Sequence, residues 1–196
     1  MPLFNTKIKS LPNEFIYHQN TLSSQKSLAL YQHLIDHCRW QQPQIQMFGK
    51  QISIPRLQCY FGDPQASYQY SGLLMQPNPW PQALLGIKAR LSLICDTPFN
   101  ALLVNWYRTG QDSMGWHSDD EVELGINPTI ASLSLGETRL FKIRNKKTKQ
   151  VIDLPLSDGD CLIMQGSAQR DYQHSLPKQN KVLSGRLNLT FRYVMP

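Results

Sequence analysis

Two histidines and one aspartate have the side-chain types and the spacing to bind a metal ion. His117 and Asp119 stand two positions apart in WHSDDE, and side chains two apart on an extended strand point to the same face. His174, in YQHSLPK, lies 57 residues after His117 (174 − 117 = 57) and is the best candidate for a third ligand. Two histidines and a carboxylate on one face of an octahedron leave three positions open, which is the facial triad of non-haem Fe(II) oxygenases. An H-x-D pair alone often binds no metal, so this prediction depends on the rest of the chain.

A second candidate site lies on the alternating segment RLNLTFRYV. Its leucines and aromatic residues would face a core, and the opposite face of the strand would carry Arg186, Asn188, Thr190 and Arg192. Guanidinium groups bind carboxylates through paired hydrogen bonds, so a small dianion could lie between the two arginines. Asn105 and Tyr107, two apart in LVNWY, could add hydrogen bonds from a neighbouring strand. The alternative is a strand face that is exposed to solvent.

The segments that would position these residues are short strands. From residue 100 onward, apolar segments such as ALLVNWY, IASLSL, RLFKIRN and CLIMQ alternate with polar or glycine turns, which is typical of a sandwich or jelly roll. Apolar periodicity in the first half predicts helices over 24–39 and 80–92, after an irregular leader over 1–22. The stretch IPRLQCYFGDPQASYQYSG alternates around GDP and predicts a hairpin. We therefore expect one domain over 1–196, α+β and mainly β, with helices in the first half and a two-sheet jelly roll over 100–194.

The composition favours a protein of the cytoplasm with a polyanionic partner. The 196 residues carry a formal net charge of +6, which suits a polyanion without proving one. The four cysteines show no C-x-x-C spacing, which is typical of free thiols in a reducing compartment. The first residues lack the apolar core of a signal peptide, and no apolar run approaches the length of a membrane span. We therefore expect a soluble, cytoplasmic protein that does not act at a membrane.

One ordered set of motifs resembles a known family. N-x-Y, WHSDDE, IASLSLG, QHSLPK and RLNLTFR together look like the AlkB family of Fe(II)- and 2-oxoglutarate-dependent dioxygenases, most of all its nucleic-acid dealkylating members related to the human homologues two and three. The similarity runs from about residue 45 to 194 and implies a double-stranded β-helix. It implies Fe(II) bound by His117, Asp119 and His174. It also implies 2-oxoglutarate held by Asn105, Tyr107, Arg186, Asn188 and Arg192, with Arg186 on the distal carboxylate and Arg192 at the metal-proximal end.

The same resemblance implies the reaction. O2 and 2-oxoglutarate would be consumed, succinate and CO2 would form, and a methyl group on a ring nitrogen would leave as formaldehyde. The substrates would be bases of the 1-methyladenine or 3-methylcytosine type in alkylated DNA, single- or double-stranded, with RNA as a further candidate. The hard chemistry would belong to the iron and its cosubstrate, and the protein would supply placement and exclusion of water.

Residues 45–72 would then form a nucleotide-recognition lid. An enzyme that acts on a base must extrude it and stack it on a side chain. The resemblance makes Tyr70 that platform, with Tyr68, Ser71 and Arg56 nearby. Asp120 and Glu121, next to the metal aspartate, would favour ring-methylated bases because these carry positive charge. Without the resemblance, the tyrosines would simply pack and the two acids would form a solvated turn.

The segment QMFGK, at 46–50, bears on strand preference. It resembles the finger loop with which the duplex-acting human homologue fills the gap left by a flipped base, so Phe48 would be an apolar wedge. The alternative is a buried phenylalanine at a turn. The stretches NWYRTGQDSMGWHSDDE and QGSAQRDYQH look closer to the homologue that prefers single strands. The sequence therefore leaves strand preference open, and DNA against RNA as well.

A basic run is the last candidate for contact with nucleic acid. Eleven residues contain no acid and hold six cations, namely Arg139, Lys142, Arg144, Lys146, Lys147 and Lys149. On two strands and their turn this run could follow phosphates, with Lys146 and Lys147 at the turn. The alternative is an ordinary solvated face.

Two other classes of function fit part of this pattern. A 2-oxoglutarate-dependent hydroxylase of a protein or a small molecule would keep the triad and the arginines, but it would not need the lid tyrosines, the finger or the basic run. A non-catalytic jelly-roll binding module would need none of the ligands, so their full complement argues against it. We favour a nucleic-acid dealkylase that acts as a monomer.

Overall fold

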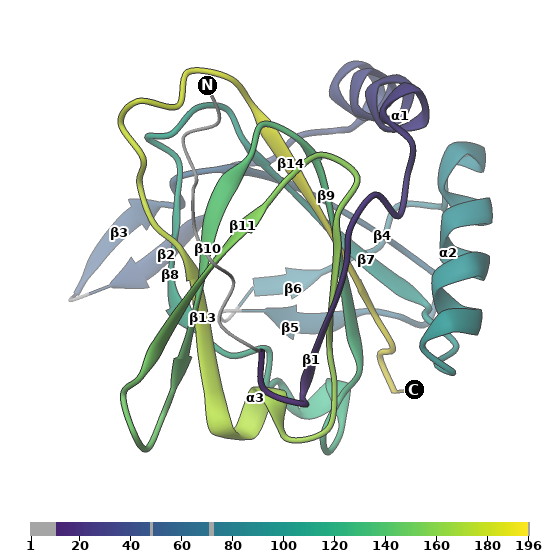
Figure 1. The fold of residues 1–196 in the computed structure, drawn as a ribbon. Coiled ribbons are helices and arrows are strands. Elements are labelled where there is room, and N and C mark those ends of the chain that lie inside the picture. The colour runs from purple at the N-terminus through teal and green to yellow at the C-terminus, as the bar shows by residue number, and fades with distance from the viewer. Residues whose placement is uncertain (1–10, 48, 71–72, 196) are drawn as a thin grey trace.

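The computed structural model describes residues 11–47, 49–70 and 73–195. Strands dominate the part of the chain that it describes, and the helices are few (Figure 1). In chain order the elements are β1 (Phe15–His18), α1 (Ser24–His37), β2 (Gln44–Met47), β3 (Lys50–Ser53), β4 (Leu57–Gly62), β5 (Tyr68–Tyr70), β6 (Leu73–Met75), α2 (Gln82–Ile94), β7 (Ala101–Tyr107), β8 (Met114–His117), the 3-10 turn η1 (Val122–Leu124), β9 (Ile130–Gly136), β10 (Arg139–Asn145), β11 (Val151–Leu156), β12 (Cys161–Met164), α3 (Ala168–Asp171), β13 (Tyr172–Leu176) and β14 (Arg186–Arg192).

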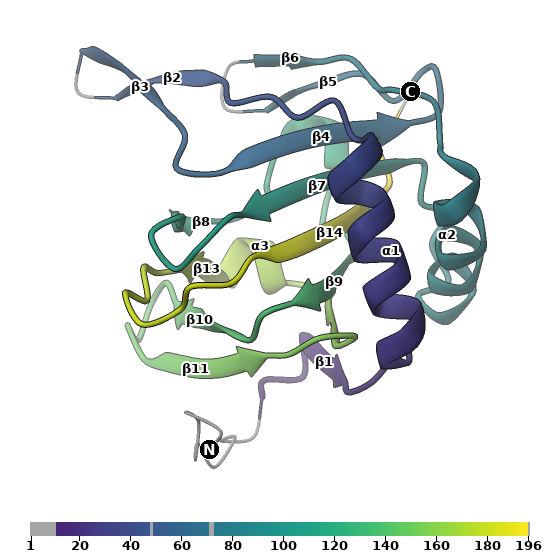
Figure 2. The ribbon, with the colours of Figure 1, turned by 90° about the horizontal axis from the view of Figure 1, so that it is seen from above.

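Two antiparallel sheets form the centre of the molecule. The larger has the order β1-β12-β9-β14-β7-β4, and the smaller has the order β11-β10-β13-β8. The sheets face each other, and α1 and α2 cover the outer face of the larger one (Figures 1 and 2). Strands distant in sequence therefore lie side by side, as in β14, which pairs with both β7 and β9. This is the double-stranded β-helix, or jelly roll, that the strand pattern predicts.

Strand alternation divides β14 between two environments. Leu187, Leu189 and Phe191 belong to the core between the larger sheet and the two helices, together with Leu34 of α1 and Leu84 of α2. The intervening side chains point the other way, into the space between the sheets. A second core fills much of that space with residues such as Ile143, Leu154 and Leu162. The inner face of β14 is thus enclosed by protein. The alternative, a strand face exposed to solvent, is wrong.

The two predicted helices are present, with their ends shifted by about two residues. α1 follows Ser23, which has extended backbone at the N-cap, and it buries Ser27, Leu30 and Leu34 at helical spacing. α2 follows Pro81, which cannot donate a backbone hydrogen bond, and it buries Leu84 and Leu91. α1 begins at the expected residue and ends two residues early, whereas α2 begins and ends two residues late, after Pro81.

Two expectations about the first half are wrong. The leader contains a strand, β1, which pairs with β12 at the edge of the larger sheet. The segments on either side of GDP do not pair with each other: β4 pairs with β7, and β5 pairs with β6. The alternation of β4 predicted the strand correctly, but it did not predict the pairing partner. β4 pairs with β7 because this position places Cys59 and Phe61 in the core of the larger sheet.

The lid region consists of two small hairpins, β2–β3 and β5–β6, which lie beyond edge strand β4 (Figure 2). Gly49, with φ +75°, lies between β2 and β3 and adopts the left-handed conformation that a tight turn there requires. Phe48 and Ser71 lie outside the described residues. Tyr68 and Tyr70 lie on β5.

No helix in the described ranges has both the length and the apolar composition that a membrane span requires.

Candidate active site

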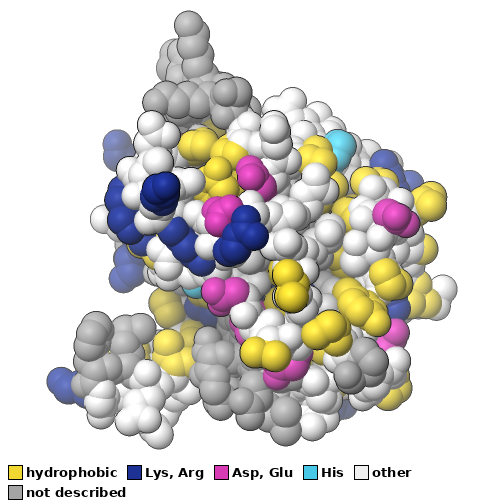
Figure 3. Space-filling model, turned by 90° about the horizontal axis from the view of Figure 1, so that it is seen from below, with side chains coloured by type: hydrophobic (Ala, Val, Ile, Leu, Met, Phe, Trp, Pro, Cys, Tyr) yellow, Lys and Arg dark blue, Asp and Glu magenta, His cyan; other side chains and the backbone are white. Residues whose placement is uncertain are grey.

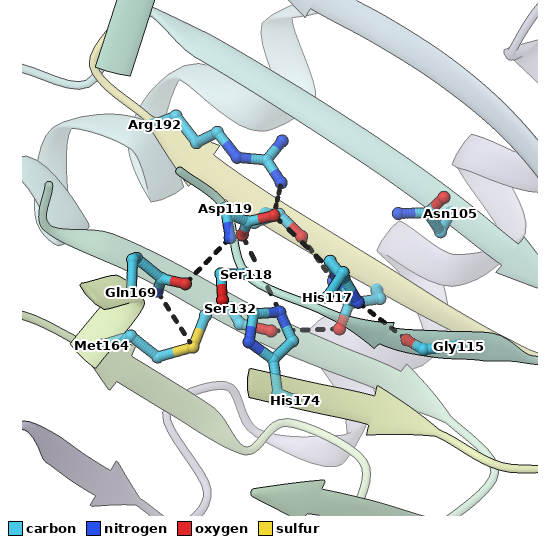
Figure 4. Close-up of polar contacts among 12 residues, drawn as sticks. Asn105, Gly115, His117, Ser118, Asp119, Ser132, Met164, Gln169, His174 and Arg192 are labelled. Carbon is cyan, nitrogen blue, oxygen red and sulfur yellow. Dashed lines mark hydrogen bonds and ion pairs between the residues drawn. The ribbon is translucent and has the colours of Figure 1, made fainter. Parts of the chain in front are cut away.

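The three predicted metal ligands come together between the sheets. His117 ends β8 and lies directly opposite His174 on the neighbouring strand β13. Asp119 lies in the loop after β8, not on the strand as the two-residue spacing predicted. One ligand atom from each residue lies within 4.8 Å of the others, so a single cation could contact all three (Figure 4).

Asp119 is an ionised carboxylate in a buried position. Burial alone would raise its pKa, but the positive charge of Arg192 and the hydrogen bond from Arg192 act against burial, and the pKa is lowered to about 2. Arg192 Nη2 lies 3.0 Å from Asp119 Oδ1. The carboxylate therefore keeps its charge at neutral pH, as a metal ligand must.

The two imidazoles are neutral. Burial is the largest cause that lowers the pKa of His174 to about 3; the charge of Arg192 acts in the same direction, and Asp119 opposes the shift. Burial also lowers the pKa of His117, although Asp119 opposes the shift. A neutral imidazole has a free lone pair on one ring nitrogen, and that lone pair is what binds a metal.

Hydrogen bonding selects the ring nitrogen of His117 that remains available. Nδ1 lies 2.9 Å from the carbonyl oxygen of Gly115, which can only accept, so Nδ1 carries the proton. The lone pair is then on Nε2, which lies 3.8 Å from Asp119 Oδ1. Nε2 of His174 lies 4.0 Å from Asp119 Oδ2. Two neutral nitrogens and one carboxylate are a donor set that suits Fe(II).

The same pocket contains the residues expected to hold 2-oxoglutarate. Its lining includes His117, Asp119 and His174, together with Asn105, Tyr107, Arg186, Asn188 and Arg192. Strand register explains this, because Asn105 pairs with Asn188 and Tyr107 with Arg186 between β7 and β14. The two strands present one polar inner face, as alternation predicted.

Arg186 has the surroundings of an anion-binding group. Its side chain is 1% exposed, and burial lowers its pKa to about 10, so it remains charged. Nη2 donates to Ser134 Oγ at 2.8 Å and to Asn188 Oδ1 at 2.9 Å, but Nε has no hydrogen-bond partner. No carboxylate of the described residues forms an ion pair with Arg186. A buried cation without an acidic neighbour is expensive, and an anionic ligand would compensate it.

Neighbouring strand β9 contributes polar groups that the sequence analysis did not select. Ser134 accepts from Arg186, and Ser132 Oγ donates to Asn188 Oδ1 at 3.0 Å. Asn188 Nδ2 in turn donates to Thr190 Oγ1 at 2.6 Å. Two serines two apart in the otherwise apolar IASLSL were the available signal, since buried polar groups need partners on the same face.

Arg56 connects the lid side of the chain to this pocket. It lies just before β4, is buried, and its Nε donates to Asn105 Oδ1 at 2.9 Å. This bond fixes the Asn105 amide, with its oxygen accepting from Arg56. The resemblance implies that Arg56 contacts the substrate. In the structure its Nε instead has a partner within the protein, the side chain of Asn105.

The two acids after Asp119 differ in their surroundings. Asp120 is exposed, and Oδ2 lies 3.9 Å from Lys146 Nζ. Glu121 is half-buried, and burial raises its pKa to about 7 despite the charge of Arg192. Glu121 Oε2 is buried without a hydrogen-bond partner. Both acids follow Asp119 directly in the chain, and their contact with a cationic base stays a prediction.

Much of the basic run is bound within the protein. Arg139 is fully buried and donates to the carbonyl oxygens of Thr109, Asp112 and Pro177, so the prediction that it follows phosphates is wrong. Its inward position follows from alternation on β10, which places residues 139, 141 and 143 in the core.

Two further cations of the run have partners at the surface. Lys142 Nζ lies 2.7 Å from Asp153 Oδ1 on the paired strand β11. The guanidinium of Arg144 lies 4.2 Å from the ring centre of Trp116 and donates to Gln173 Oε1 at 2.8 Å. Figure 3 shows Lys and Arg side chains gathered on one side of the molecule with acidic side chains beside them. The basic run therefore gives the surface less positive charge than six cations would, because Arg139 is buried and Lys142 is paired with an acid.

Lys146 and Lys147 differ although they are adjacent. Lys146 is half-buried and its Nζ donates to the carbonyl oxygen of Gln169 at 2.8 Å. Lys147 is exposed in the turn between β10 and β11. Lys147 is thus the better candidate for a phosphate contact.

Replacement of Lys147 by alanine is expected to weaken binding of duplex oligonucleotides of every sequence to a similar degree. Each phosphate contact contributes about 0.9 to the slope of log affinity against log salt, so the slope should fall by about that amount. Affinities measured at several salt concentrations would test this. Lys26→Ala, an exposed lysine on α1, is the matched control because it lies on the other side of the larger sheet. An unchanged slope would show that Lys147 is only solvated.

Comparisons with known proteins agree with this site. Residues 14–192 match the model of the 2OG-Fe(II) oxygenase superfamily. The chain is 41% identical over 160 residues to DNA oxidative demethylase ALKBH2 of Bos taurus, covering 78% of this chain and 58% of that protein. It is 43% identical over 152 residues to alpha-ketoglutarate-dependent dioxygenase alkB homolog 3 of Mus musculus, covering 72% of this chain and 52% of that protein. The chain thus spans little more than half the length of these two relatives.

Two further similarities extend over more of the relative. DNA oxidative demethylase ALKBH2 of Arabidopsis thaliana is 32% identical over 210 residues, covering 93% of this chain and 67% of that protein. The solved structure of OsALKBH1 superimposes with a TM-score of 0.66 at 19% identity, covering 94% of this chain and all of that one, and supports the fold. Membership of such a family implies Fe(II), 2-oxoglutarate and O2, which the donor set and the buried Arg186 fit. The chain belongs to the AlkB family of the 2OG-Fe(II) oxygenase superfamily.

Proposed function

We propose that this protein oxidatively demethylates N-alkylated bases in DNA and thereby repairs alkylation damage directly. The observation that carries the proposal is the pocket between the sheets, where an ionised aspartate and two neutral histidines lie near a buried, uncompensated Arg186. The names of the relatives, DNA oxidative demethylase among them, support the nucleic-acid substrate. The proposed bases are of the 1-methyladenine and 3-methylcytosine type, with RNA as a second polymer.

Each polar residue of the pocket has a proposed role. With Fe(II), 2-oxoglutarate and O2 bound, a centre of this kind oxidises an N-methyl group, and the product loses formaldehyde. Nε2 of His117 and of His174 and the Asp119 carboxylate would hold the metal. Arg186 would bind the distal carboxylate of 2-oxoglutarate, because it lines the pocket as a buried cation that has no ion pair with an acid in the described part of the chain, whereas the pocket arginine Arg192 faces Asp119.

The remaining pocket residues would orient the cosubstrate and the base. Asn105, Asn188 and Tyr107 line the wall next to Arg186 and would hydrogen-bond to 2-oxoglutarate. Arg192 is already 3.0 Å from Asp119 and would lie between the metal ligand and the near end of the cosubstrate. Tyr70 is the proposed stacking platform, and Tyr68 and Ser71 its neighbours. Asp120 and Glu121 would select cationic bases.

Release of formaldehyde tests the proposal directly. An oligonucleotide with one 1-methyladenine should yield formaldehyde and the unmodified base only when Fe(II) and 2-oxoglutarate are both present. A hydroxylase of proteins or small molecules would instead consume 2-oxoglutarate without repairing the base. Absence of repair on methylated DNA and on methylated RNA would refute the proposal.

Strand preference gives a further prediction. We propose that Phe48, between β2 and β3, fills the gap left by a flipped base, so that the enzyme accepts duplex as well as single-stranded DNA, as a monomer. Flipping from a duplex costs a few kcal/mol, of which stacking of an aromatic ring recovers about 1–3 kcal/mol. Phe48→Ala is therefore expected to lower the repair rate in duplex by about tenfold or more, and to leave the rate in a single strand nearly unchanged.

Both rates should be measured on the same lesion in the same sequence. An equal loss on both substrates would make Phe48 a structural residue, and no loss on either would exclude a wedge. Phe48→Leu is the conservative variant, because it keeps an apolar side chain but removes the ring that stacks.

A further inference from the structure

Asp119 lies in a loop whose position is not fixed by strand pairing. β8 ends at His117, so the backbone of Asp119 has no partner in the ladder between β8 and β13. A metal ligand on an unpaired loop would sample several orientations, and binding would have to restrict them. Arg192 contacts the Asp119 carboxylate, but the backbone of this loop needs a contact of its own to stay beside the two histidines.

Gln169 makes that contact. Its side chain is 2% exposed, and its Oε1 accepts from the backbone N–H of Asp119 at 2.9 Å (Figure 4). Its Nε2 faces the sulfur of Met164 at 3.6 Å, so both ends of the amide are used and the oxygen is directed toward Asp119. A second bond supports the loop, because Ser118 Oγ donates to the carbonyl oxygen of Tyr172 at 2.9 Å.

Lys146 extends this arrangement to the β10–β11 turn. Its Nζ donates to the backbone carbonyl of Gln169 at 2.8 Å, and its own backbone N–H donates to the carbonyl of Asp171 at 2.8 Å. Both acceptors belong to α3, a single turn of helix that carries Gln169. Lys146 thus fixes the short helix, and the helix fixes the glutamine.

We propose that Gln169 is a positioning residue for the metal ligand Asp119, and that Lys146 acts through Gln169 by holding α3. The side chain of Lys146 is then chiefly occupied inside the protein, and its exposed neighbour Lys147 is the residue available to phosphates. The inference rests on the proposed metal centre and not on the identity of the substrate. Contacts that orient a metal ligand from behind affect metal affinity by about tenfold to a hundredfold when removed.

Co(II) is a suitable probe, because it binds the same kind of donor set and is followed by its visible absorption without turnover. The protein is titrated with Co(II) in the absence of 2-oxoglutarate. Gln169→Leu removes the acceptor at similar size and is expected to weaken Co(II) binding by about tenfold to a hundredfold. Gln169→Glu keeps an oxygen acceptor in either protonation state and is expected to retain most of the affinity.

Lys146→Met and Lys147→Met form a matched pair on one turn. The first should weaken Co(II) binding, by less than Gln169→Leu does, and the second should not change it. This pair keeps the test valid if Gln169→Leu does not fold. Thermal unfolding of the metal-free proteins measures general destabilisation. Loss of positioning is instead measured by the Co(II) affinity, which should fall in Gln169→Leu and be retained in Gln169→Glu.

The outcomes are distinct. If the wild-type protein does not bind Co(II), the metal centre itself is wrong. If the wild-type protein binds Co(II) and both Gln169→Leu and Lys146→Met bind it equally well, the centre stands and the positioning role of Gln169 is refuted. Weaker binding in Lys146→Met but not in Lys147→Met supports the proposal.

Discussion

Alanine in place of any one of His117, Asp119 and His174 is expected to abolish turnover and to leave the fold largely intact. Each residue supplies one of three donor atoms within 4.8 Å of each other, and two remaining donors would leave Fe(II) weakly held and wrongly oriented. The strands that carry the histidines are held by β13 pairing with both β10 and β8, which does not depend on the imidazoles. Circular dichroism and formaldehyde release, measured on the same preparations, would test both parts.

The exposed residue His18 gives a matched control. It lies on edge strand β1, away from the pocket, so His18→Ala should keep full activity. Asp119→Asn is the most informative variant, because it keeps the shape of the side chain and removes the charge that Arg192 faces at 3.0 Å. Wild-type activity that survives thorough removal of iron by chelation would contradict the whole assignment.

Loss of Arg186 should have the second largest effect, and it should appear in the requirement for 2-oxoglutarate. Removal of one partner of a buried ion pair costs about 3–5 kcal/mol, because the other charge is left without compensation. About 3 kcal/mol corresponds to roughly a hundredfold in affinity, so Arg186→Ala should raise the concentration of 2-oxoglutarate needed for half-maximal rate by at least about that factor. The Fe(II) requirement should change much less.

Direct binding separates this role from a structural one. Calorimetric titration of 2-oxoglutarate into the metal-loaded protein should show the same loss as the kinetics. Arg186→Lys keeps the charge but not the paired donors, so it should bind more weakly than the wild type and more tightly than alanine. Arg39→Ala, at an exposed arginine outside the pocket, is the matched control. An unchanged 2-oxoglutarate titration for Arg186→Ala would refute the assignment.

Local patterns in the sequence carried most of the fold and most of the chemistry. Alternation along β14 identified both the core residues and the polar inner face, because successive side chains of a strand point to opposite sides. The motif spacing identified His117, Asp119 and His174, and the structure brings them together. The apolar periodicity of α1 and α2 identified both helices, because one face of each packs on the sheet.

Other features were decided only when distant segments met. β4 and β5 alternate on either side of a turn, yet β4 pairs with β7 because its apolar face completes a core that residues of α1, α2 and β14 also build. The cations of one basic run divide between core and surface according to which side chain of β10 points inward, so Arg139 is buried and Lys147 is exposed. The pairing partner of a strand and the burial of its side chains depend on which segments pack against each face. Those segments are distant in the chain, so the local sequence does not specify them.

The position of Asp119 shows the same limit within the site. Its type and its place beside His117 were evident from the sequence alone, and together with His174 and the downstream motifs they predicted a metal ligand. Its orientation depends on the amide of Gln169, which is 50 residues away along the chain and reaches Asp119 only because β13 returns beside β8. The sequence by itself determined which groups are available for chemistry, and the tertiary structure determined which of them face one another, because contacts between distant residues exist only after the strands have paired.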